Sequence, residues 1–278
     1  MKKNYKLAFI GCGNMGEALI KGLLGKNFIS SKNIIGMDIS KERLRYIKKT
    51  YSVEAVQRNR DAVKKGDIII LAVKPQDITT VLKEIAGEIN RSKLLISIAA
   101  GVSLKFIESF SSSKIRLIRV MPNTPALIQE GAAALSKGNY ATEDDLETAR
   151  KIFNTIGKTV IIDEKLMDAV TGLSGSGPAY IFTIVEALIA AGVKMGLSRE
   201  VSQELSVQTL LGSAKMIVET GEHPARLRDM VTSPGGTTVA GLHVLEKEGL
   251  SEIIMNAIEA ATKRSKELGK FLSKKKEK

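Results

Sequence analysis

Two spacings of hydrophobic residues alternate along the first part of the chain. Short apolar runs, as expected of strands buried on both faces of a sheet, are separated by segments whose apolar residues recur every three or four positions, as in amphipathic helices. The predicted strands are 6–11, 33–38, 67–73, 93–101, 115–122, 131–138 and 157–163, and the clearest predicted helices are 14–27, 40–51 and 143–156. Strand–helix–strand repetition at this spacing predicts a parallel, doubly wound α/β sheet.

The pattern changes near Glu164, and no strand is expected from there to Arg264. The segment 179–197 is apolar on most helical faces, so other helices must surround it, while Glu186 and Lys194 argue against a membrane span. One helical domain is too small to cover this segment alone, so we expect a second copy of the chain to do so. The sequence therefore predicts an N-terminal Rossmann-like domain and an all-α C-terminal dimerisation domain, with bounds 1–164 and 165–278.

Composition and charge narrow the choice of partners. Of the 278 residues, 44% are hydrophobic and 26% charged, with a formal net charge of +12. Basic chains bind nucleic acid or acidic membranes, but only 4% of residues are aromatic and Trp is absent, so platforms for stacking bases are scarce. We expect the positive field to attract an anionic cofactor or metabolite, with neither nucleic acid nor membrane as partner. The N-terminal apolar run, 7–10, is too short for a signal-peptide core, so the expected location is the cytoplasm.

The segment GCGNMG follows the first predicted strand and opens the first predicted helix. Gly11 permits a tight turn, Gly13 lets the backbone approach a pyrophosphate, and Gly16 allows close packing of helix on strand. Free N–H groups at the helix start complete a predicted dinucleotide site. Cys12, the only cysteine, is interpreted as a small residue tolerated in this turn rather than as a nucleophile, because no histidine is near it in sequence.

Asp38 ends the second predicted strand, where folds of this kind bind the adenosine ribose. A carboxylate there accepts hydrogen bonds from the ribose diol and repels a 2′-phosphate, which favours NAD. Ser40, Lys41 and Arg43 follow immediately, and they could either hold a phosphate or simply face solvent. The sequence leaves both NADH and NADPH open as the cofactor.

Three further loops follow predicted strands: AVKPQ (72–76), SIAAG (97–101) and VMPNTP (120–125). In doubly wound sheets, ligands bind at the carboxyl ends of the strands. The small side chains of Ala99 and Ala100 would let a flat nicotinamide ring lie against the backbone. The three loops and the glycine turn together predict one site.

The motifs FIGCGNMG, LAVKPQ, SIAAGV, RVMPNTPA, TGLSGSGPAY and DMVTSPGGTT occur in this order, and together they resemble those of the pyrroline-5-carboxylate reductases. The resemblance runs from about residue 6 to residue 268, and SPGGTT followed by a helix is its most specific part. Members of that family reduce the cyclic imine of pyrroline-5-carboxylate to L-proline with NADPH or NADH, the last step of proline synthesis. The resemblance implies an oxidoreductase acting on a C=N bond, built as an interlocked homodimer, with higher oligomers of dimers left open.

The resemblance also implies the site residues. It places the cofactor against Ile10, Gly11, Cys12, Gly13, Asn14, Met15, Asp38, Ser40, Asn59, Ala72, Val73, Lys74, Pro75, Ala99, Ala100 and Gly101. It places the substrate against Ser233, Gly235, Gly236, Thr237 and Thr238. Asp38 departs from the neutral residues often found at its position, which weakens any preference for NADPH.

Reduction of a protonated imine needs orientation rather than a strong acid, and the sequence shows no catalytic triad, paired carboxylates or metal cluster. The two glycines after Pro234 leave N–H groups uncovered at the start of the predicted helix 238–246, which suits a carboxylate. We expect Thr238 to contact the ring nitrogen as the catalytic or orienting residue. A plain helix cap is the alternative reading of these threonines and glycines, and the two roles are compatible.

Other residues and activities compete with this assignment. Ser174 and Ser176 could approach the substrate, although close packing explains them better, and His223 and His243 are weak candidates for general acids. A hydroxyacid dehydrogenase is the nearest enzymatic alternative, but it needs an acid/base such as Lys165 beside the carbinol. A dinucleotide sensor or nucleic-acid-binding protein would leave the second anion loop unexplained.

Overall fold

The computed structural model describes residues 5–111 and 114–276. Two compact units make up the chain. Residues up to Ser176, together with those from Glu259 onward, form the first unit, and residues 177–258 form the second.

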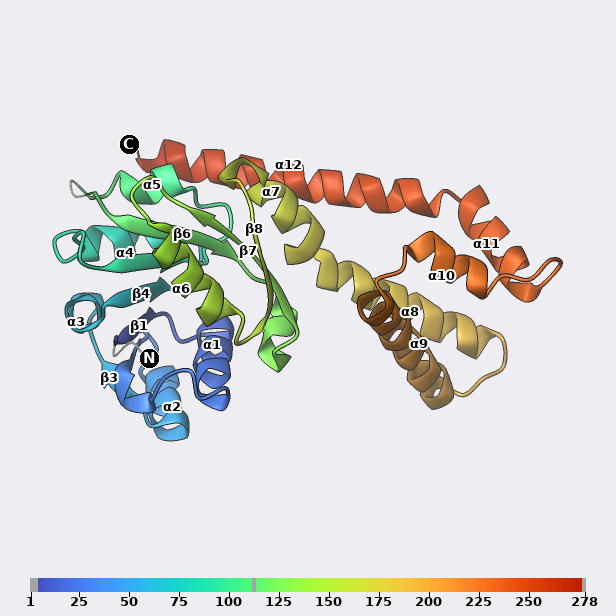
Figure 1. Ribbon diagram of the computed structural model, residues 1–278, viewed down its shortest axis with the longest axis horizontal. Coiled ribbons are helices and arrows are strands. Elements are labelled where there is room, and N and C mark those ends of the chain that lie inside the picture. The colour runs from blue at the N-terminus through green and yellow to red at the C-terminus, as the bar shows by residue number, and fades with distance from the viewer. Residues whose placement is uncertain (1–4, 112–113, 277–278) are drawn as a thin grey trace. The chain divides into compact units, whose positions relative to one another are not determined.

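A mixed sheet of eight strands forms the centre of the first unit (Figure 1). Its strand order is β3-β2-β1-β4-β5-β6-β7-β8. Neighbouring strands are parallel except β6 and β7, which pair antiparallel. The strands are β1 (Leu7–Ile10), β2 (Ile34–Met37), β3 (Glu54–Val56), β4 (Ile68–Leu71), β5 (Leu94–Ser97), β6 (Arg116–Met121), β7 (Gly131–Lys137) and β8 (Gly157–Ile161).

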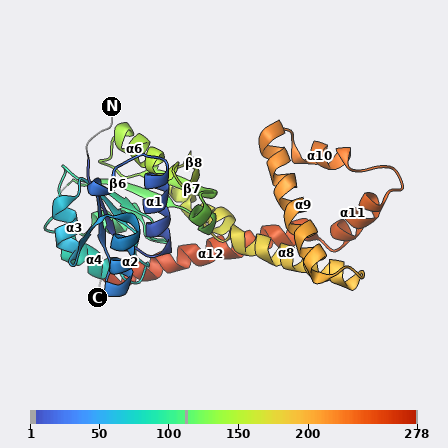
Figure 2. The ribbon, with the colours of Figure 1, turned by 90° about the horizontal axis from the view of Figure 1, so that it is seen from below.

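Helices cover both faces of the sheet, as the buried apolar runs predicted (Figure 2). Side chains of β1 alternate between two hydrophobic clusters: Leu7 and Phe9 pack with α1 and α6, whereas Ala8 and Ile10 pack with α3, α4 and α5. The doubly wound Rossmann-like fold is thus confirmed. The helices are α1 (Asn14–Gly25), α2 (Lys41–Tyr51), α3 (Asn59–Lys65), α4 (Ile78–Ile85), α5 (Leu104–Glu108), α6 (Glu143–Phe153) and α7 (Met167–Val170), with short 3₁₀ turns at Ser31–Asn33, Thr124–Ile128 and Glu164–Leu166.

The reversal at β7 departs from the predicted all-parallel sheet. Only the short 3₁₀ turn Thr124–Ile128 lies between β6 and β7. A parallel crossover needs a dozen or more residues, usually with a helix, so this short connection returns the chain antiparallel. The edge strand β3 was also not predicted, because its three residues, of which only Val56 is buried, are too few to show a hydrophobic pattern.

The second unit is helical throughout, as predicted for this part of the chain. It contains α8 (Gly177–Lys194), α9 (Arg199–Thr220), α10 (Pro224–Met230), α11 (Thr237–Lys247) and the first part of α12 (Leu250–Lys276). A single π-helical turn, Thr171–Gly175, precedes α8. The helices α8 and α9 pack together, yet most of their apolar side chains stay exposed in the single chain: Phe182 is 67% exposed and only Ile189 of α8 is buried.

Candidate functional site

In the glycine turn between β1 and α1, Gly11 and Gly16 face backbone atoms, whereas Gly13 faces open space. Gly11 has φ +94°, and a Cβ there would lie 2.5 Å from the carbonyl oxygen of Ala72. A Cβ on Gly16 would lie 2.4 Å from the carbonyl oxygen of Gly11, whereas one on Gly13 would meet no atom within 4 Å. Gly13 is the N-cap of α1 and makes no side-chain cap hydrogen bond. The turn therefore presents a bare helix start, beside which a pyrophosphate has room.

Cys12 lies in this turn, but its thiol has no chemical role there. It is fully buried, and its Sγ lies 3.5 Å from the carbonyl oxygen of Met37. Burial raises the pKa of the Cys12 thiol to about 12, and the neighbouring Asp38 carboxylate adds to the effect. A thiol that stays protonated is a poor nucleophile, in agreement with its interpretation as a small residue in a tight turn.

Asp38 follows β2, and its carboxylate is fixed by backbone groups. Oδ2 accepts a hydrogen bond from the N–H of Cys12 at 2.8 Å, and Oδ1 accepts one from the N–H of Ser40 at 2.9 Å. Ser40 in turn caps α2, because its Oγ accepts from the N–H of Arg43 at 3.2 Å, as the sequence predicted. The half-buried Asp38 carboxylate, at the end of β2, is therefore hydrogen-bonded to the glycine turn that follows β1.

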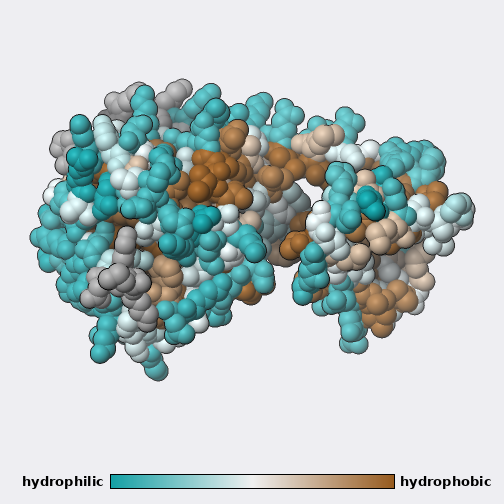
Figure 3. Space-filling view, in the orientation of Figure 1, coloured by the Kyte–Doolittle hydropathy of each residue, from teal (hydrophilic) through white to brown (hydrophobic). Residues whose placement is uncertain are grey.

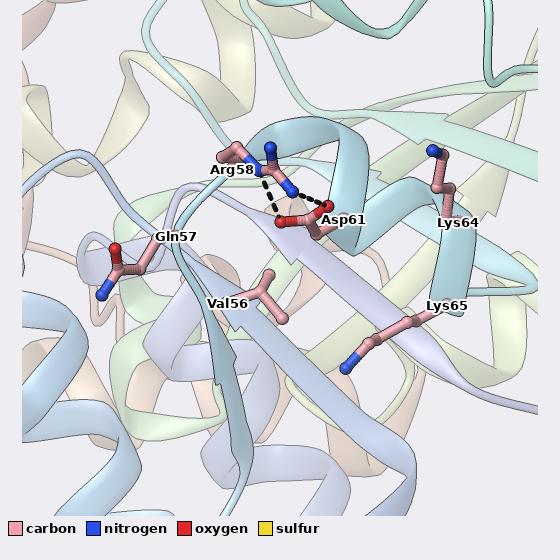
Figure 4. Close-up of a pocket in the computed structure, with 6 residues that line it drawn as sticks. All are labelled: Val56, Gln57, Arg58, Asp61, Lys64 and Lys65. Carbon is pink, nitrogen blue, oxygen red and sulfur yellow. Dashed lines mark hydrogen bonds and ion pairs between the residues drawn. The ribbon is translucent and has the colours of Figure 1, made fainter.

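Asn59 is the first residue of α3, and it is 6% exposed. Its Nδ2 donates to Oε2 of Glu84 at 2.6 Å, while its Oδ1 is buried without a hydrogen-bond partner within the described residues. Buried polar atoms rarely lack a partner. The residues on either side of Asn59 in sequence line an exposed, largely cationic hollow of about 480 Å³, where Arg58 and Asp61 pair with each other (Figure 4). None of the predicted cofactor residues lines that hollow, so we do not assign it to the site.

The loops after β4 and β5 lie at the same edge of the sheet as the glycine turn. β4 pairs with β1, and the N–H of Ala72 continues this pairing by donating to the carbonyl oxygen of Ile10 at 2.8 Å. β5 pairs with β4, so the predicted residues Ala99, Ala100 and Gly101 come next along that edge. The structure thus brings together the predicted residues 10–15, Asp38, Ser40, 72–75 and 99–101 along the carboxyl ends of four neighbouring strands.

A further hollow of about 460 Å³ adjoins these loops within the first unit. Sequence reasoning did not predict that the far end of α12 would form one wall of it. A Cβ on Gly269 would lie 2.8 Å from the carbonyl oxygen of Gly101, and Oγ of Ser265 donates to Oδ1 of Asp168 at 2.6 Å. The residues that line the hollow are Pro75, Gln76, Ala100, Gly101, Thr171, Ser176, Ala261, Arg264, Ser265, Leu268 and Phe271. Ser176 lines this hollow, which leaves both its expected packing role and a role near the substrate open.

The predicted substrate loop, 233–238, is a tight exposed turn at the start of α11 in the second unit. Gly235 has φ +69°, and a Cβ on Gly236 would lie 2.4 Å from Oγ of Ser233. Gly236 is the N-cap and makes no side-chain cap hydrogen bond, so Thr237 and Thr238 are the first two helical residues rather than the cap. The first N–H groups of α11 are therefore bare of side-chain caps.

One of the two histidines has a structural role. His223 is the N-cap of α10, and its Nδ1 accepts a hydrogen bond from the N–H of Ala225 at 3.2 Å. His243 lies within α11. Among the described residues, no three His, Cys, Asp or Glu side chains come together as a metal site.

The doubly wound sheet, its bare glycine turn and the acidic residue after β2 define a dinucleotide-binding protein of the Rossmann class. Comparisons with known proteins are more specific. The family profile described as "Pyrroline-5-carboxylate reductase dimerisation" matches residues 164–268, and "NADP oxidoreductase coenzyme F420-dependent" matches residues 6–101.

Relatives match over nearly the whole chain. The pyrroline-5-carboxylate reductase of Methanosarcina acetivorans is 45% identical, over 96% of this chain and 99% of its own. The reductase of Synechocystis sp. is 46% identical, over 95% of this chain and 98% of its own. Among solved structures, the reductase of Coxiella burnetii has a TM-score of 0.91 at 36% identity, covering 96% of this chain and 99% of its own. The Plasmodium falciparum reductase with NADP bound has a TM-score of 0.86 at 39% identity, with the same coverage. The chain belongs to the pyrroline-5-carboxylate reductase family.

Proposed function

We propose that this protein reduces 1-pyrroline-5-carboxylate to L-proline with NADPH or NADH, the last step of proline biosynthesis. Family membership over nearly the full length is the observation that carries the proposal. The reaction is the transfer of a hydride to the carbon of a C=N bond in a five-membered ring, and the ring nitrogen ends as an amine. The protein is therefore an NAD(P)H-dependent oxidoreductase with a small carboxylated imine as its substrate.

The glycine turn fits a dinucleotide cofactor, which supplies the hydride when bound. Gly13 leaves open space above bare N–H groups, as a pyrophosphate requires. The unpartnered Oδ1 of Asn59 is an acceptor of the kind that a cofactor hydroxyl would need. On this proposal the cofactor residues are the sixteen named from the sequence, with Asp38 at the ribose and Ala99, Ala100 and Gly101 at the nicotinamide. The cofactor domain is 1–164 and the dimerisation domain 165–278.

The substrate carboxylate is assigned to the loop 233–238. The uncapped N–H groups at the start of α11 favour an anion, and the backbone of Gly235 and Gly236 has no side chain to obstruct it. The hydroxyl of Thr238, the second residue of α11, is assigned to the ring nitrogen of the substrate. These groups hold the ring in one orientation, which is what hydride transfer to an already electrophilic iminium carbon needs.

The exposed apolar faces of α8 and α9 are assigned to a homodimer interface. The stretch Glu164–Lys194 is long and apolar enough to cross a membrane by length and composition alone. The matched profile is described as a dimerisation domain, however, and a second copy would cover these side chains without burying Glu186 in lipid. Hydrophobic side chains reach the surface over these helices (Figure 3). We infer a soluble cytoplasmic dimer with neither membrane nor nucleic acid as partner, and oligomers of such dimers are compatible with it.

The competing activities are less well supported. Lys165, the acid/base that a hydroxyacid dehydrogenase would need, is 76% exposed and pairs with Asp163 at 3.0 Å. Purified protein mixed with pyrroline-5-carboxylate and either NADH or NADPH should consume the reduced nicotinamide and yield proline in equal amounts. Activity on hydroxyacids but not on the cyclic imine would support the dehydrogenase instead. Salt-sensitive binding to random DNA without turnover would support the sensor.

A further inference from the structure

We propose that this chain selects NADH over NADPH, and that Asp38 sets the preference while Glu17 keeps Arg43 from opposing it. The inference rests on the proposed function, because it concerns the reductant of the same reaction. The two cofactors differ only in a phosphate on the adenosine ribose. The choice therefore depends on the charges at the end of β2.

The Asp38 carboxylate is held in one position rather than free to swing away. Both of its oxygens accept backbone N–H bonds, from Cys12 at 2.8 Å and from Ser40 at 2.9 Å. A carboxylate oxygen can accept more than one hydrogen bond, so each retains capacity for a ribose hydroxyl. A 2′-phosphate in the same place would lie against a fixed carboxylate, and like charges in contact are strongly disfavoured.

Arg43 is the cation that could offset this repulsion, and it is already engaged. Its Nε donates to the carbonyl oxygen of Cys12 at 2.6 Å, and its guanidinium pairs with the carboxylate of Glu17 and lies over the ring of Tyr46. The pair points the guanidinium at the glycine turn and neutralises its charge. A 2′-phosphate would have to compete with these three contacts for the guanidinium.

Glu17 is itself held in place by two phenols. The hydroxyls of Tyr51 and Tyr46 both donate to its Oε1, at 2.7 Å and 3.1 Å. Partial burial raises the pKa of Glu17, but the hydrogen bonds from Tyr51, Arg43 and Tyr46 outweigh it and leave the pKa below its ordinary value. Glu17 is therefore ionised at neutral pH, and the Arg43–Glu17 pair is intact under assay conditions.

The remaining cations near Asp38 are exposed and less constrained. Asp38 lines a hollow of about 690 Å³ together with Lys41, Arg45 and Lys48. All three side chains are exposed, and Nε of Arg45 donates to the carbonyl oxygen of Lys41 at 3.2 Å. Solvated surface charges are screened by salt, whereas Asp38 lies where the ribose is bound. We therefore assign the preference to the fixed carboxylate rather than to these solvated cations.

Two measurements test this proposal: steady-state kinetics with NADH and NADPH, and the binding of ADP-ribose with and without the 2′-phosphate. We expect kcat/KM with NADH to exceed that with NADPH by roughly tenfold or more. Calorimetry should show ADP-ribose binding more tightly than its 2′-phosphorylated form, and this needs no turnover and no variant. Failure to form proline with either reductant would refute the proposed function while leaving the fragment comparison intact. Equal or better use of NADPH, or tighter binding of the phosphorylated fragment, would overturn the preference alone.

Two variants separate the roles of the two carboxylates. Asp38→Asn removes the charge but keeps an acceptor, and it should shrink the NADH preference mainly through a lower KM for NADPH. Glu17→Gln releases Arg43 and should shift the preference in the same direction, less strongly. Asp61→Asn is the matched control, because Asp61 pairs with Arg58 outside the site (Figure 4). An unchanged ratio in both folded variants, as judged by circular dichroism, would overturn the assignment to Asp38 and Glu17, as would an equal change in the control.

Discussion

Gly16 lies so close to Gly11 that a Cβ on Gly16 would come within 2.4 Å of the Gly11 carbonyl oxygen. This contact fixes the start of α1 against the end of β1. Gly13, between them, has an extended backbone and open space where its side chain would be. One motif thus contains a glycine required by the fold and a glycine that leaves space for a ligand.

Substitution of these two glycines by alanine should separate folding from cofactor binding. Gly16→Ala should destabilise the protein by about 1–3 kcal/mol, because backbone atoms must move, which lowers Tm by roughly 2–12 °C. Gly13→Ala should leave Tm within about 2 °C of the parent, yet raise the KM for the nicotinamide cofactor at least about tenfold by obstructing the pyrophosphate. Thermal melts without ligand and cofactor titrations measure the two effects. A folded Gly13→Ala variant with normal cofactor binding would contradict the placement of the pyrophosphate.

The Cys12 thiol should resist alkylation in the native protein. Its pKa of about 12 leaves little thiolate at pH 8, so reaction should be more than about 100-fold slower than for an exposed cysteine. Because the folded-state pKa is raised, the resulting stabilisation is complete below the ordinary thiol pKa of about 8.5 and is lost as the pH rises towards 12. Thiol titration should count no reactive group in the native chain and one after denaturation, and Cys12→Ala should flatten the alkaline decline of Tm. Rapid native alkylation at pH 8 would disprove the buried placement.

Replacement of Thr238 by alanine should slow turnover without weakening cofactor binding. We expect kcat to fall about 10- to 100-fold, as when one orienting hydrogen bond is removed, with the Kd for the nicotinamide cofactor unchanged. Thr220→Ala, at the exposed end of α9, is the control, because its hydroxyl bonds only within its own turn and to the adjoining N–H of Glu222. Loss of cofactor binding in Thr238→Ala would show that the loop does not belong to the substrate.

The apolar surface of α8 should hold two copies together. Phe182→Asp places a charge where we assign the dimer interface, and it should weaken association by about 3 kcal/mol or more, roughly 100-fold or more in dimer Kd. Analytical ultracentrifugation across a concentration series measures this change. Val160→Asp on β8, where the parent side chain is 58% exposed, is the matched control in the first unit. A dimer that is equally stable in both variants would place the interface elsewhere.

The pattern of apolar residues predicted most of the first unit because each buried strand also carries its own local signal. β1, β2, β4 and β5 lie inside their predicted ranges. Two features have physical reasons for escaping prediction. The edge strand β3 has only three residues, and the direction of β7 depends on a connection too short for a crossover. The start of α2 was also predictable, because the predicted cap Ser40 accepts a hydrogen bond from the N–H of Arg43 in the first turn.

The chemistry of the site was less predictable, because it depends on residues distant in sequence. The sequence could place Asp38 and Arg43 near the cofactor but not show that Glu17 engages Arg43 from α1. It could not bring Arg264 and Ser265 of α12 to the hollow beside Gly101. Both are outcomes of tertiary packing, for which hydrophobic periodicity carries no signal.

Transfer of the hydride itself tests the central claim most directly. The protein would be incubated with pyrroline-5-carboxylate and NADH that carries deuterium on the transferred position of nicotinamide C4. The proposed function predicts proline with one deuterium on the ring carbon that was the imine carbon, as read by mass spectrometry and NMR. Absence of proline, or proline without deuterium at that carbon, would contradict it.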